Sequence, residues 1–477
     1  MDMNNELTEI QSKTVKMRQV LNNYAIMVSD IRWHDASSFE CYQIYPVPGT
    51  RIQTLRQLET DIAVSLGVPG LRIVVMEDSV GIEIPKKDRK PLLFQDCIED
   101  YLSERRYRLP VILGEGLHKS LRVADLASMP HLLISGATKQ GKTEYLKTMI
   151  LSLVRKKEPE DLKFVLIDPK NTEFAPFRDL VGAYLATLPG SGSVIEEKET
   201  CIATDSGRAE LMLSSLCREL EERYELLSKA GVSDIEKYKK KLQEGKLLPK
   251  DGHRHLPYLV CVCDEYADLV MFSNKKSVKS IKNDVIRLAQ KGRAAGIHMV
   301  IATQRPCADV ITGTLKCNFP ARMAFRVASK IDSITILDTG GAEKLSGNGD
   351  MLFSCGMDCE RLQAPIIEKE EMDKAIADAA SPDDTLGSGT PYYLPEVVCG
   401  ENENISNEPL CPDDPLYDAA MSLAVMTQSC SQTMLQRKLG IGFARAGRLV
   451  DLLIEKGVVV GKAGAYTVRK KSFESVD

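Results

Sequence analysis

One segment constrains the fold more than any other: residues 131–145, which read HLLISGATKQGKTEY. It opens with an apolar run, residues 132–134, that is short enough for a buried strand. The pattern G-x-x-x-x-G-K-[ST] follows from Gly136 to Thr143, and residues 144–156 then show apolar positions at helical spacing. A strand, a glycine-rich loop and a helix in this order predict an α/β fold with a nucleotide-binding P-loop.

The residue types of this loop suit phosphate chemistry. Its glycines let the backbone curl, so that successive N–H groups point at phosphate oxygens, and the following helix N-terminus favours anions. Lys142 can reach the β- and γ-phosphates, and the Thr143 hydroxyl can bind Mg²⁺. The predicted nucleotide-binding residues are Gly136, Ala137, Thr138, Lys139, Gln140, Gly141, Lys142 and Thr143.

A second apolar run, residues 258–263, ends in Asp264 and Glu265. In open α/β sheets the carboxyl ends of the strands face the ligand. We therefore expect Asp264 to hold Mg²⁺ through water and Glu265 to activate a water for attack on the γ-phosphate. Taken alone, two acidic residues after a strand fit a surface turn equally well. Together with the P-loop they favour hydrolysis of the nucleotide.

Residues 298–304 form a further predicted strand with polar residues at its end. Gln304 is placed to sense the γ-phosphate or to orient the attacking water. The alternative is that Gln304 only makes a turn hydrogen bond before Pro306.

Composition and spacing divide the chain into four parts. Residues 1–110 show an α+β pattern, which predicts a small N-terminal domain, and residues 111–380 contain the P-loop core. Residues 381–415 are rich in Pro, Gly, Ser, Asn, Asp and Glu and contain no Lys or Arg, which predicts a mobile acidic linker. Residues 416–477 read as three helices, over residues 417–426, 431–439 and 443–456, with a glycine turn between the second and the third. A β-hairpin, the wing, follows, and the whole predicts a winged helix-turn-helix domain.

The net charge of −5 gives no overall signature of a nucleic-acid-binding protein, so a DNA contact needs a local basic patch. The C-terminal domain supplies such a patch and favours DNA over the alternative, a winged helix that binds protein. The predicted DNA-binding residues are Arg437, Lys438, Arg445, Arg448 and Lys462.

No window approaches about 20 consecutive apolar residues, and the N-terminus is polar, so we expect neither a transmembrane segment nor a signal peptide. The 13 cysteines are scattered without metal-binding spacing. Reduced thiols in a cytoplasmic protein are the simpler interpretation, and a metal site the alternative.

Taken together, several stretches resemble the FtsK/SpoIIIE DNA translocases. The stretch that precedes the P-loop is Met129-Pro-His-Leu-Leu, and the others follow in family order. They are Ile167-Asp-Pro-Lys170, Glu221-Glu-Arg-Tyr224, Asp264-Glu-Tyr-Ala-Asp-Leu269, Lys291-Gly-Arg-Ala-Ala-Gly-Ile-His298, Ala302-Thr-Gln-Arg-Pro306, Ser329-Lys-Ile-Asp-Ser333, Gly341-Ala-Glu-Lys-Leu345 and Gly349-Asp-Met351. Residues 80–85 look like part of the family's α domain, and residues 435–442 like part of its γ winged helix.

This resemblance implies a RecA-like core that uses ATP and Mg²⁺ to move along double-stranded DNA. It further implies a homo-oligomeric ring, a hexamer, with each ATP site between subunits. The winged helix would orient loading, and in some family members it contacts a tyrosine recombinase. Arg322 is our candidate for an arginine finger that reaches a neighbour's γ-phosphate, with Arg293 and Arg326 as competitors.

Three features depart from the family pattern. The membrane-spanning region usual in the family does not appear in this sequence. Ile334 stands where the family usually has arginine, and Ala444 where the recognition helix usually has asparagine. Asparagine suits adenine, so the family's preferred DNA sequence does not carry over.

Two rival functions use the same core. One is a related motor that moves protein in secretion, and the basic C-terminal domain argues against it. The other is a DNA-binding regulator that uses ATP only as an assembly switch. Glu265 argues against that role, because a switch needs no residue to activate water.

Overall fold

The computed structural model of the 477-residue chain describes residues 2–189, 194–356, 359–380, 392–396, 417–427, 435, 449–450, 453, 459–462 and 465–468. The chain divides into two compact units, residues 1–397 and residues 398–477. The first unit contains an N-terminal domain and the P-loop core.

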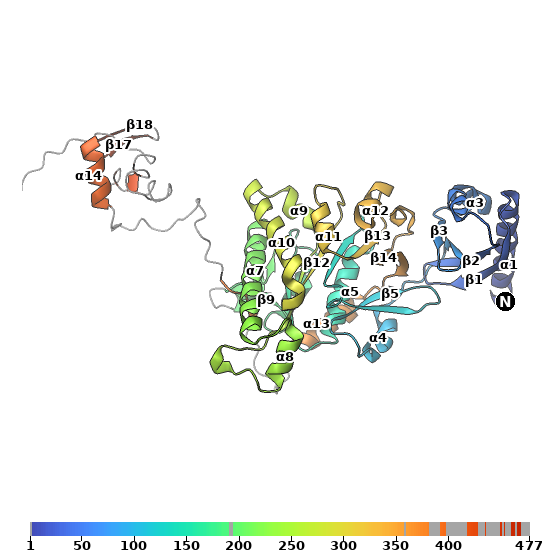
Figure 1. The fold of residues 1–477 in the computed structure, drawn as a ribbon, viewed down its shortest axis with the longest axis horizontal. Coiled ribbons are helices and arrows are strands. Elements are labelled where there is room, and N and C mark those ends of the chain that lie inside the picture. The colour runs from blue at the N-terminus through green and yellow to red at the C-terminus, as the bar shows by residue number, and fades with distance from the viewer. Residues whose placement is uncertain are drawn as a thin grey trace, which may run out of the picture. The chain divides into compact units, whose positions relative to one another are not determined.

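The N-terminal domain is an antiparallel sheet of four strands in the order β1-β2-β4-β3, with helices packed on it (Figure 1). Its core includes Leu21, Tyr42 and Ile82. Residues 52–66 form two helices, which meet at Leu58. The elements are α1 (Asp2–Asn23), β1 (Val28–Asp35), β2 (Phe39–Pro46), α2 (Ile52–Gln57), α3 (Glu59–Leu66), β3 (Arg72–Val75) and β4 (Val80–Pro85).

The P-loop core is built on a ten-stranded sheet in the order β10-β8-β11-β12-β7-β13-β14-β15-β5-β6. The strands from β10 to β13 in this order are parallel, and those from β14 to β6 extend the sheet in antiparallel fashion. The P-loop strand β7 therefore lies inside the sheet, between β12 and β13. The strands are β5 (Pro110–Glu115), β6 (Leu121–Asp125), β7 (His131–Ser135), β8 (Leu162–Ile167), β10 (Ile202–Ala203), β11 (Tyr258–Cys263), β12 (Ile297–Thr303), β13 (Ala321–Phe325), β14 (Asp350–Cys355) and β15 (Cys359–Gln363).

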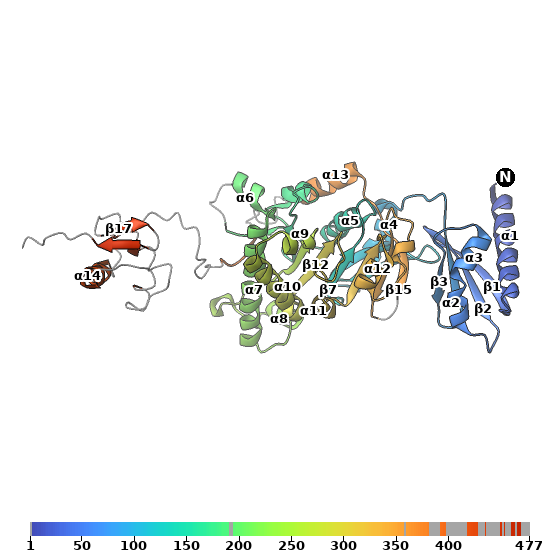
Figure 2. The same cartoon turned by 90° about the horizontal axis from the view of Figure 1, so that it is seen from above.

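Helices cover both faces of this sheet (Figures 1 and 2). Successive residues of a strand point to opposite faces, so Leu132 and Ile134 pack with α4, α5, α8 and α13, whereas Leu133 packs with α7, α9, α10, α11 and α12. The helices are α4 (Phe94–Ser103), α5 (Lys142–Val154), α6 (Val194–Thr200), α7 (Ser206–Lys229), α8 (Ile235–Gln243), α9 (Tyr266–Met271), α10 (Lys275–Ala295), α11 (Gly313–Asn318), α12 (Lys330–Leu337) and α13 (Lys369–Ala380).

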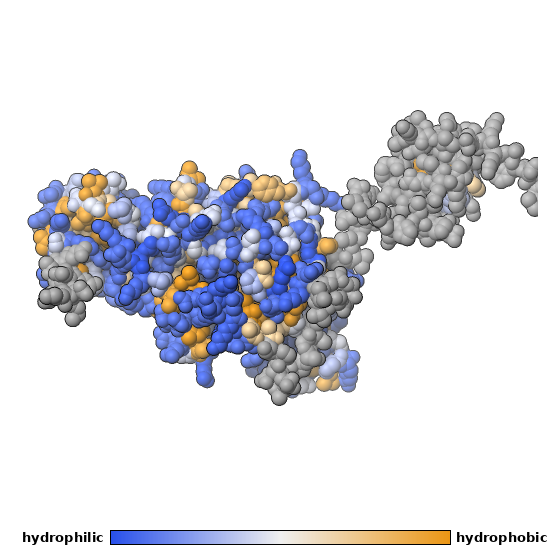
Figure 3. Space-filling view, turned by 180° about the vertical axis from the view of Figure 1, so that it is seen from behind, coloured by the Kyte–Doolittle hydropathy of each residue, from blue (hydrophilic) through white to orange (hydrophobic). Residues whose placement is uncertain are grey.

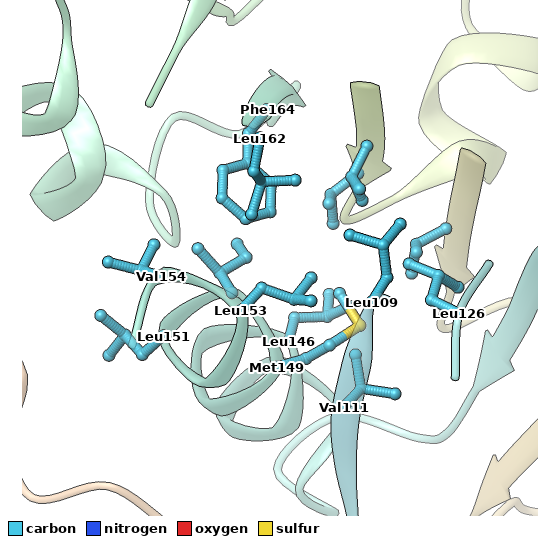
Figure 4. Packing of buried hydrophobic residues seen from close by; sticks show 14 of the residues in the cluster. Leu109, Val111, Leu126, Leu146, Met149, Leu151, Leu153, Val154, Leu162 and Phe164 are labelled. Carbon is cyan, nitrogen blue, oxygen red and sulfur yellow. The ribbon is translucent and has the colours of Figure 1, made fainter. Parts of the chain in front are cut away.

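Helix α5, which follows the P-loop, is anchored by its apolar residues. Leu146, Met149 and Leu153 pack toward Val111 of β5 and Phe164 of β8 (Figure 4). Burying a leucine or methionine side chain contributes roughly 1.5–3 kcal/mol. This packing holds the N-terminus of α5, and with it the P-loop, at one edge of the sheet.

Helix α4 belongs to the same core by its contacts. The Tyr101 hydroxyl donates hydrogen bonds to the backbone oxygens of Ser152 at 2.6 Å and Pro110 at 3.0 Å. The residues of α4 lie within the range 1–110, over which the sequence predicts the N-terminal domain. Their packing groups them with the P-loop core instead.

Residues 392–396 lie in the predicted linker, yet they pack on the first unit. Strand β16 (Tyr392–Tyr393) pairs in parallel with β9 (Ala186–Thr187). The Leu394 side chain is 1% exposed within the core. The Tyr392 hydroxyl donates to Oε1 of the buried Glu219 at 2.7 Å. We call residues 392–396 the docked segment.

In the second unit the described elements are α14 (Tyr417–Thr427) and an antiparallel hairpin, β17 (Val459–Lys462) and β18 (Ala465–Val468). They fall where the sequence predicts the first helix and the wing of the winged helix. The predicted second and third helices lie outside the described residues, apart from Leu435, Leu449, Val450 and Leu453, which are buried.

The face of the molecule shown in Figure 3 is mainly hydrophilic, with hydrophobic residues in small, separate groups. None of the helices that the structure describes combines the length and the hydropathy needed to cross a bilayer.

Candidate nucleotide-binding site

The residues predicted to act on the nucleotide meet at one edge of the sheet. Because β11, β12 and β7 are parallel neighbours, their carboxyl ends lie side by side. Strand β11 delivers Asp264 and Glu265, β12 delivers Thr303 and Gln304, and β7 leads into the P-loop. Sequence spacing predicts this edge correctly, because each strand is a continuous apolar run followed by polar residues.

The P-loop fits between neighbouring backbones, and this explains its two glycines. A Cβ atom on Gly136 would lie 2.7 Å from Cβ of Phe325, and one on Gly141 would lie 2.7 Å from the backbone nitrogen of Gly349. Gly141 also has a φ of +111°, which side chains disfavour. Any larger residue at either position would force the loop away from the strand that supports it.

The Lys142 side chain reaches across the edge to β11. Its ammonium donates to Oδ1 of Asp264 at 2.7 Å and to the backbone oxygen of Asp264 at 2.6 Å. The side chains of Lys142 and Asp264 are 3% and 2% exposed. Breaking a buried pair of this kind by removing one partner costs about 3–5 kcal/mol.

The Glu265 carboxylate is fixed by residues from β12. Oε1 accepts a hydrogen bond from the Thr303 hydroxyl at 2.6 Å, and the backbone N–H of Gln304 donates to Oε2 at 3.0 Å. Glu265 is 1% exposed. These contacts hold the carboxylate in one orientation at the sheet edge, as required of a group that must face an attacking water.

The side chain of Gln304 connects β12 to the P-loop. Its Oε1 accepts a hydrogen bond from the Thr138 hydroxyl at 2.8 Å. Through its backbone and its side chain, Gln304 therefore contacts both Glu265 and the P-loop. This position suits a residue that responds to the γ-phosphate, and that role stays a prediction.

A cavity of about 760 Å³ opens at this edge. Its lining includes Gln304 and the P-loop residues Ala137, Thr138, Lys139, Gly141, Lys142 and Thr143. It also includes residues that sequence reasoning did not assign to the site, namely Lys87, Arg89, Lys90, Asn348, Gly349 and residues 363–366. The volume suits a nucleotide, since ligand pockets commonly span about 300–1,000 Å³.

The donor chemistry of the site fits Mg²⁺. Thr143 lines the cavity, and Asp264 lies at the end of β11, which β12 separates from the P-loop strand, so one hydroxyl and one carboxylate are available as oxygen ligands. The described residues contain no group of three metal-binding side chains. A site for Mg²⁺ does not require one, because this ion usually keeps several waters and takes other ligands from the phosphates.

The guanidinium of Arg322 is held by contacts within its own chain. Its Nε donates to the backbone oxygen of Phe319 at 3.1 Å, and its Nη2 donates to that of Lys316 at 3.1 Å. Its Nη1 contacts the backbone oxygen of Ile336 and forms an ion pair with Asp338. The guanidinium thus caps α11 and α12 and is 17% exposed, and its role as an arginine finger stays a prediction.

The competing candidates for a finger are more exposed. Arg326 is exposed beside the P-loop, since its backbone oxygen accepts from the N–H of Ala137 at 2.9 Å. Arg293 is exposed near the opposite ends of the strands, where it lines a cavity with Tyr258 and His298. The predicted finger thus stays open among Arg322, Arg326 and Arg293.

The predicted DNA-binding residues cannot be placed. Arg437, Lys438, Arg445 and Arg448 lie outside the described residues. Lys462 ends strand β17, where it pairs with Ala465, but its side chain is not described.

Comparison with known families identifies this arrangement. The FtsK/SpoIIIE family matches residues 94–308, the FtsK alpha domain residues 2–86, and the Ftsk gamma domain residues 412–470. The chain belongs to the FtsK/SpoIIIE family. The motor match begins at residue 94, where α4 begins, in agreement with the packing of that helix.

Two curated relatives illustrate the likeness. The chain is 36% identical to a DNA translocase FtsK of Chlorobaculum tepidum over 461 residues, which are 94% of this chain and 55% of the relative. It is 33% identical to a DNA translocase FtsK of Oceanobacillus iheyensis, covering 95% of this chain and 55% of the relative. The chain thus spans about half the length of the curated relatives it matches.

Solved structures share the fold of the core. The conjugation coupling protein TcpA of pCW3, with ATPγS, is 22% identical with a TM-score of 0.52, covering 78% of this chain and 100% of that chain. The type VII secretion ATPase EccC of Thermomonospora curvata is 21% identical with a TM-score of 0.51, covering 65% of this chain and 36% of that chain. These likenesses show that this FtsK/SpoIIIE member shares the fold of its core with both structures.

Proposed function

We propose that this chain is an ATP-driven motor that translocates along double-stranded DNA. The observation that carries the proposal is the joint placement of Lys142, Asp264 and Glu265 at one sheet edge beside a nucleotide-sized cavity. A chain that only binds ATP needs the P-loop, but it does not need a carboxylate held by Thr303 and Gln304.

Within the motor, the residues divide the work. The P-loop amides and Lys142 bind the phosphates, and Thr143 and Asp264 hold Mg²⁺, which offsets the charge that develops on the phosphates. Glu265 orients a water and accepts its proton, a role worth about 10²–10⁴-fold in rate. Gln304 lies between Glu265 and the P-loop, where it is placed to signal whether a γ-phosphate is present.

A basic surface on the core supports DNA as the substrate. Lys275, Lys276 and Lys279 are exposed in the first half of α10, and residues 275–283 contain no acidic residue. Arg305 lies nearby and stacks over the exposed ring of Phe272 at 5.6 Å. Lysines bind DNA through its phosphates, and such contacts are not sequence-specific, as translocation along any sequence requires.

We also propose a ring of identical subunits, most simply a hexamer, with the winged helix orienting the motor on DNA. The chain has one P-loop, so repeated sites around DNA require repeated subunits. Mass measurement with an ATP analogue and duplex DNA tests this. A monomer with full DNA-stimulated ATPase activity would contradict it.

The deciding experiment measures ATP hydrolysis with and without linear duplex DNA. We expect strong stimulation that falls with rising salt, because each phosphate contact releases counterions. Replacing Lys275 and Lys276 with glutamate should remove most of the stimulation by DNA. The matched control, Lys240→Glu with Lys250→Glu, changes two exposed lysines elsewhere and should leave the stimulation unchanged. Hydrolysis that ignores DNA would favour a protein-moving motor, and DNA binding without hydrolysis would favour an ATP-switched regulator.

A further inference from the structure

One wall of the nucleotide cavity comes from the segment that joins the N-terminal domain to the core. We call this segment, residues 86–92, the connector. It begins directly after β4, where the backbone N–H of Lys86 donates to the backbone oxygen of Ser38 in the N-terminal domain at 3.1 Å. Lys87, Arg89 and Lys90 then line the cavity.

Within the connector, Arg89 makes the most specific contacts. Its Nη1 donates to the backbone oxygen of Gly347 at 2.9 Å, and its Nη2 donates to that of Ser346 at 3.2 Å. A planar guanidinium can bind two neighbouring carbonyls at once, whereas a lysine ammonium acts as a point charge. Arg89 therefore fixes the loop of residues 346–349, which we call the buttress loop.

The buttress loop rests directly on the P-loop. The backbone N–H of Gly349 donates to the backbone oxygen of Gln140 at 3.0 Å. The two backbones approach so closely that a Cβ atom on Gly141 would lie 2.7 Å from the backbone nitrogen of Gly349. A shift of the buttress loop would therefore move the residues of the P-loop that surround the phosphates.

The far end of the buttress loop is tied to the N-terminal domain a second time. Asp350 accepts from the backbone N–H of Ser346 at 2.8 Å and pairs with Arg361 through both carboxylate oxygens, at 2.7 and 3.0 Å. Arg361 in turn contacts Glu83 of β4 at 3.3 Å. All three charged side chains are buried, so this link is rigid. Arg89 both bonds to the buttress loop and lines the cavity.

We propose that Arg89 is a positioning residue for ATP binding, through which the N-terminal domain holds the P-loop in its binding conformation. This inference rests on the proposed ATPase function. Arg89 contacts neither Glu265 nor Thr303, so its removal lets the P-loop move without disturbing the carboxylate that activates water. The substitution therefore weakens the binding of ATP and leaves the rate at which bound ATP is hydrolysed nearly unchanged.

The test compares three variants of the full chain in ATP titrations. Arg89→Gln should weaken binding of an ATP analogue and raise the KM for ATP about tenfold, with kcat at saturating ATP changed less than threefold. Arg89→Lys should be intermediate, because it keeps the charge but only one of the two contacts. The control, Arg122→Gln, removes an exposed ion pair with Glu360 and should behave as the parent does.

Hydrogen exchange separates positioning from a general loss of structure. In Arg89→Gln the amides of Gly349 and Ala364, which hold the buttress loop, should exchange faster, while those of β7 and β11 stay protected. If the folded Arg89→Gln chain has the same KM for ATP as the parent, the role of Arg89 is contradicted and the ATPase function is not. If the parent chain itself binds no ATP, both the ATPase function and the role of Arg89 are contradicted.

Discussion

The ammonium group of Lys142 lies 2.7 Å from Oδ1 of Asp264, so the predicted phosphate-binding lysine and the predicted magnesium-binding aspartate bond to each other. In the proposed function both groups act on bound ATP. We therefore expect ATP binding to be an exchange of partners, in which phosphate oxygens replace the Asp264 carboxylate at the ammonium and Asp264 becomes available to Mg²⁺.

This pair predicts that Lys142→Ala removes both activity and stability. ATP-dependent activity should be lost, and the free energy of unfolding should fall by about 3–5 kcal/mol, because the Asp264 carboxylate stays buried without its partner. The double change Lys142→Met with Asp264→Asn should recover most of the stability and none of the activity. Thermal unfolding and ATPase assays on the two proteins check this. Equal stability of Lys142→Ala and the parent would show that the pair is energetically unimportant.

Glu265→Gln should bind ATP normally and hydrolyse it about 10²–10⁴-fold more slowly, because an amide cannot accept the proton of the attacking water. Single-turnover hydrolysis and nucleotide titration measure the two steps separately. Glu173→Gln, which changes another carboxylate at the cavity, serves as the control and should hydrolyse ATP at a near-parent rate. Parent-rate hydrolysis by Glu265→Gln would assign the base to another residue.

Thr303→Val should lower kcat about tenfold and leave the KM for ATP nearly unchanged. The valine has a similar shape but cannot donate to Oε1 of Glu265, so the carboxylate keeps only its contact with the Gln304 backbone. Thr303→Ser, which retains the hydroxyl, is the matched control. If both variants turn over ATP at the parent rate, the hydroxyl of Thr303 does not orient the base.

The docked segment predicts where the chain can be shortened. A chain ending at residue 380 loses the burial of Leu394 and the contact of Tyr392 with Glu219, so it should be less stable than a chain ending at residue 397, by roughly 2–4 kcal/mol. The longer fragment should keep DNA-stimulated ATPase activity and lose only functions of the winged helix. Equal thermal midpoints for the two fragments would show that docking contributes little.

Two buried histidines predict that the free energy of unfolding decreases in mild acid. Burial lowers the pKa of His131 to about 3 and that of His298 to about 4. The unfolded chain, with a pKa near 6.5, binds protons that the folded chain does not, so stability falls as the pH drops below about 6.5 and continues to fall toward 4. The loss is about 1.4 kcal/mol per pH unit for each histidine.

Unfolding midpoints between pH 7.5 and 5.0 measure this loss. His298→Gln removes one titrating group and should show a shallower dependence on pH than the parent. An unchanged slope would mean that this histidine is protonated in the folded chain as easily as in the unfolded one.

The sequence predicted the residues at the centre of the candidate site but not those that line the rest of the cavity. A clear apolar run precedes each of the central residues, which are Lys142, Asp264, Glu265 and Gln304. Because the strands are parallel neighbours, their carboxyl ends lie together. No sequence pattern marked Thr303 as a partner of Glu265. The only indication was the position of Thr303 directly before Gln304. Arg89 lies between two domains, where no periodic pattern exists, and its role depends on a loop far away in sequence.

Two other differences have physical causes. A two-residue strand such as Tyr392–Tyr393 is too short to show alternation, and the surrounding Pro, Gly and acidic residues hide it. Arg322 was a candidate finger by sequence position, and no sequence pattern indicated that its guanidinium would bond to the carbonyls that end α11 and α12.

The order of the strands limits how this motor can be exchanged between relatives. The match to the family's motor ends at residue 308, yet β13, which completes the sheet beside the P-loop strand, and the buttress loop come afterwards. A gene segment cut at that boundary would encode the P-loop, Asp264, Glu265 and Gln304 and still leave β7 with an open edge, free to pair with other chains. A fragment that is to be exchanged with its sheet intact must therefore extend to the end of β15.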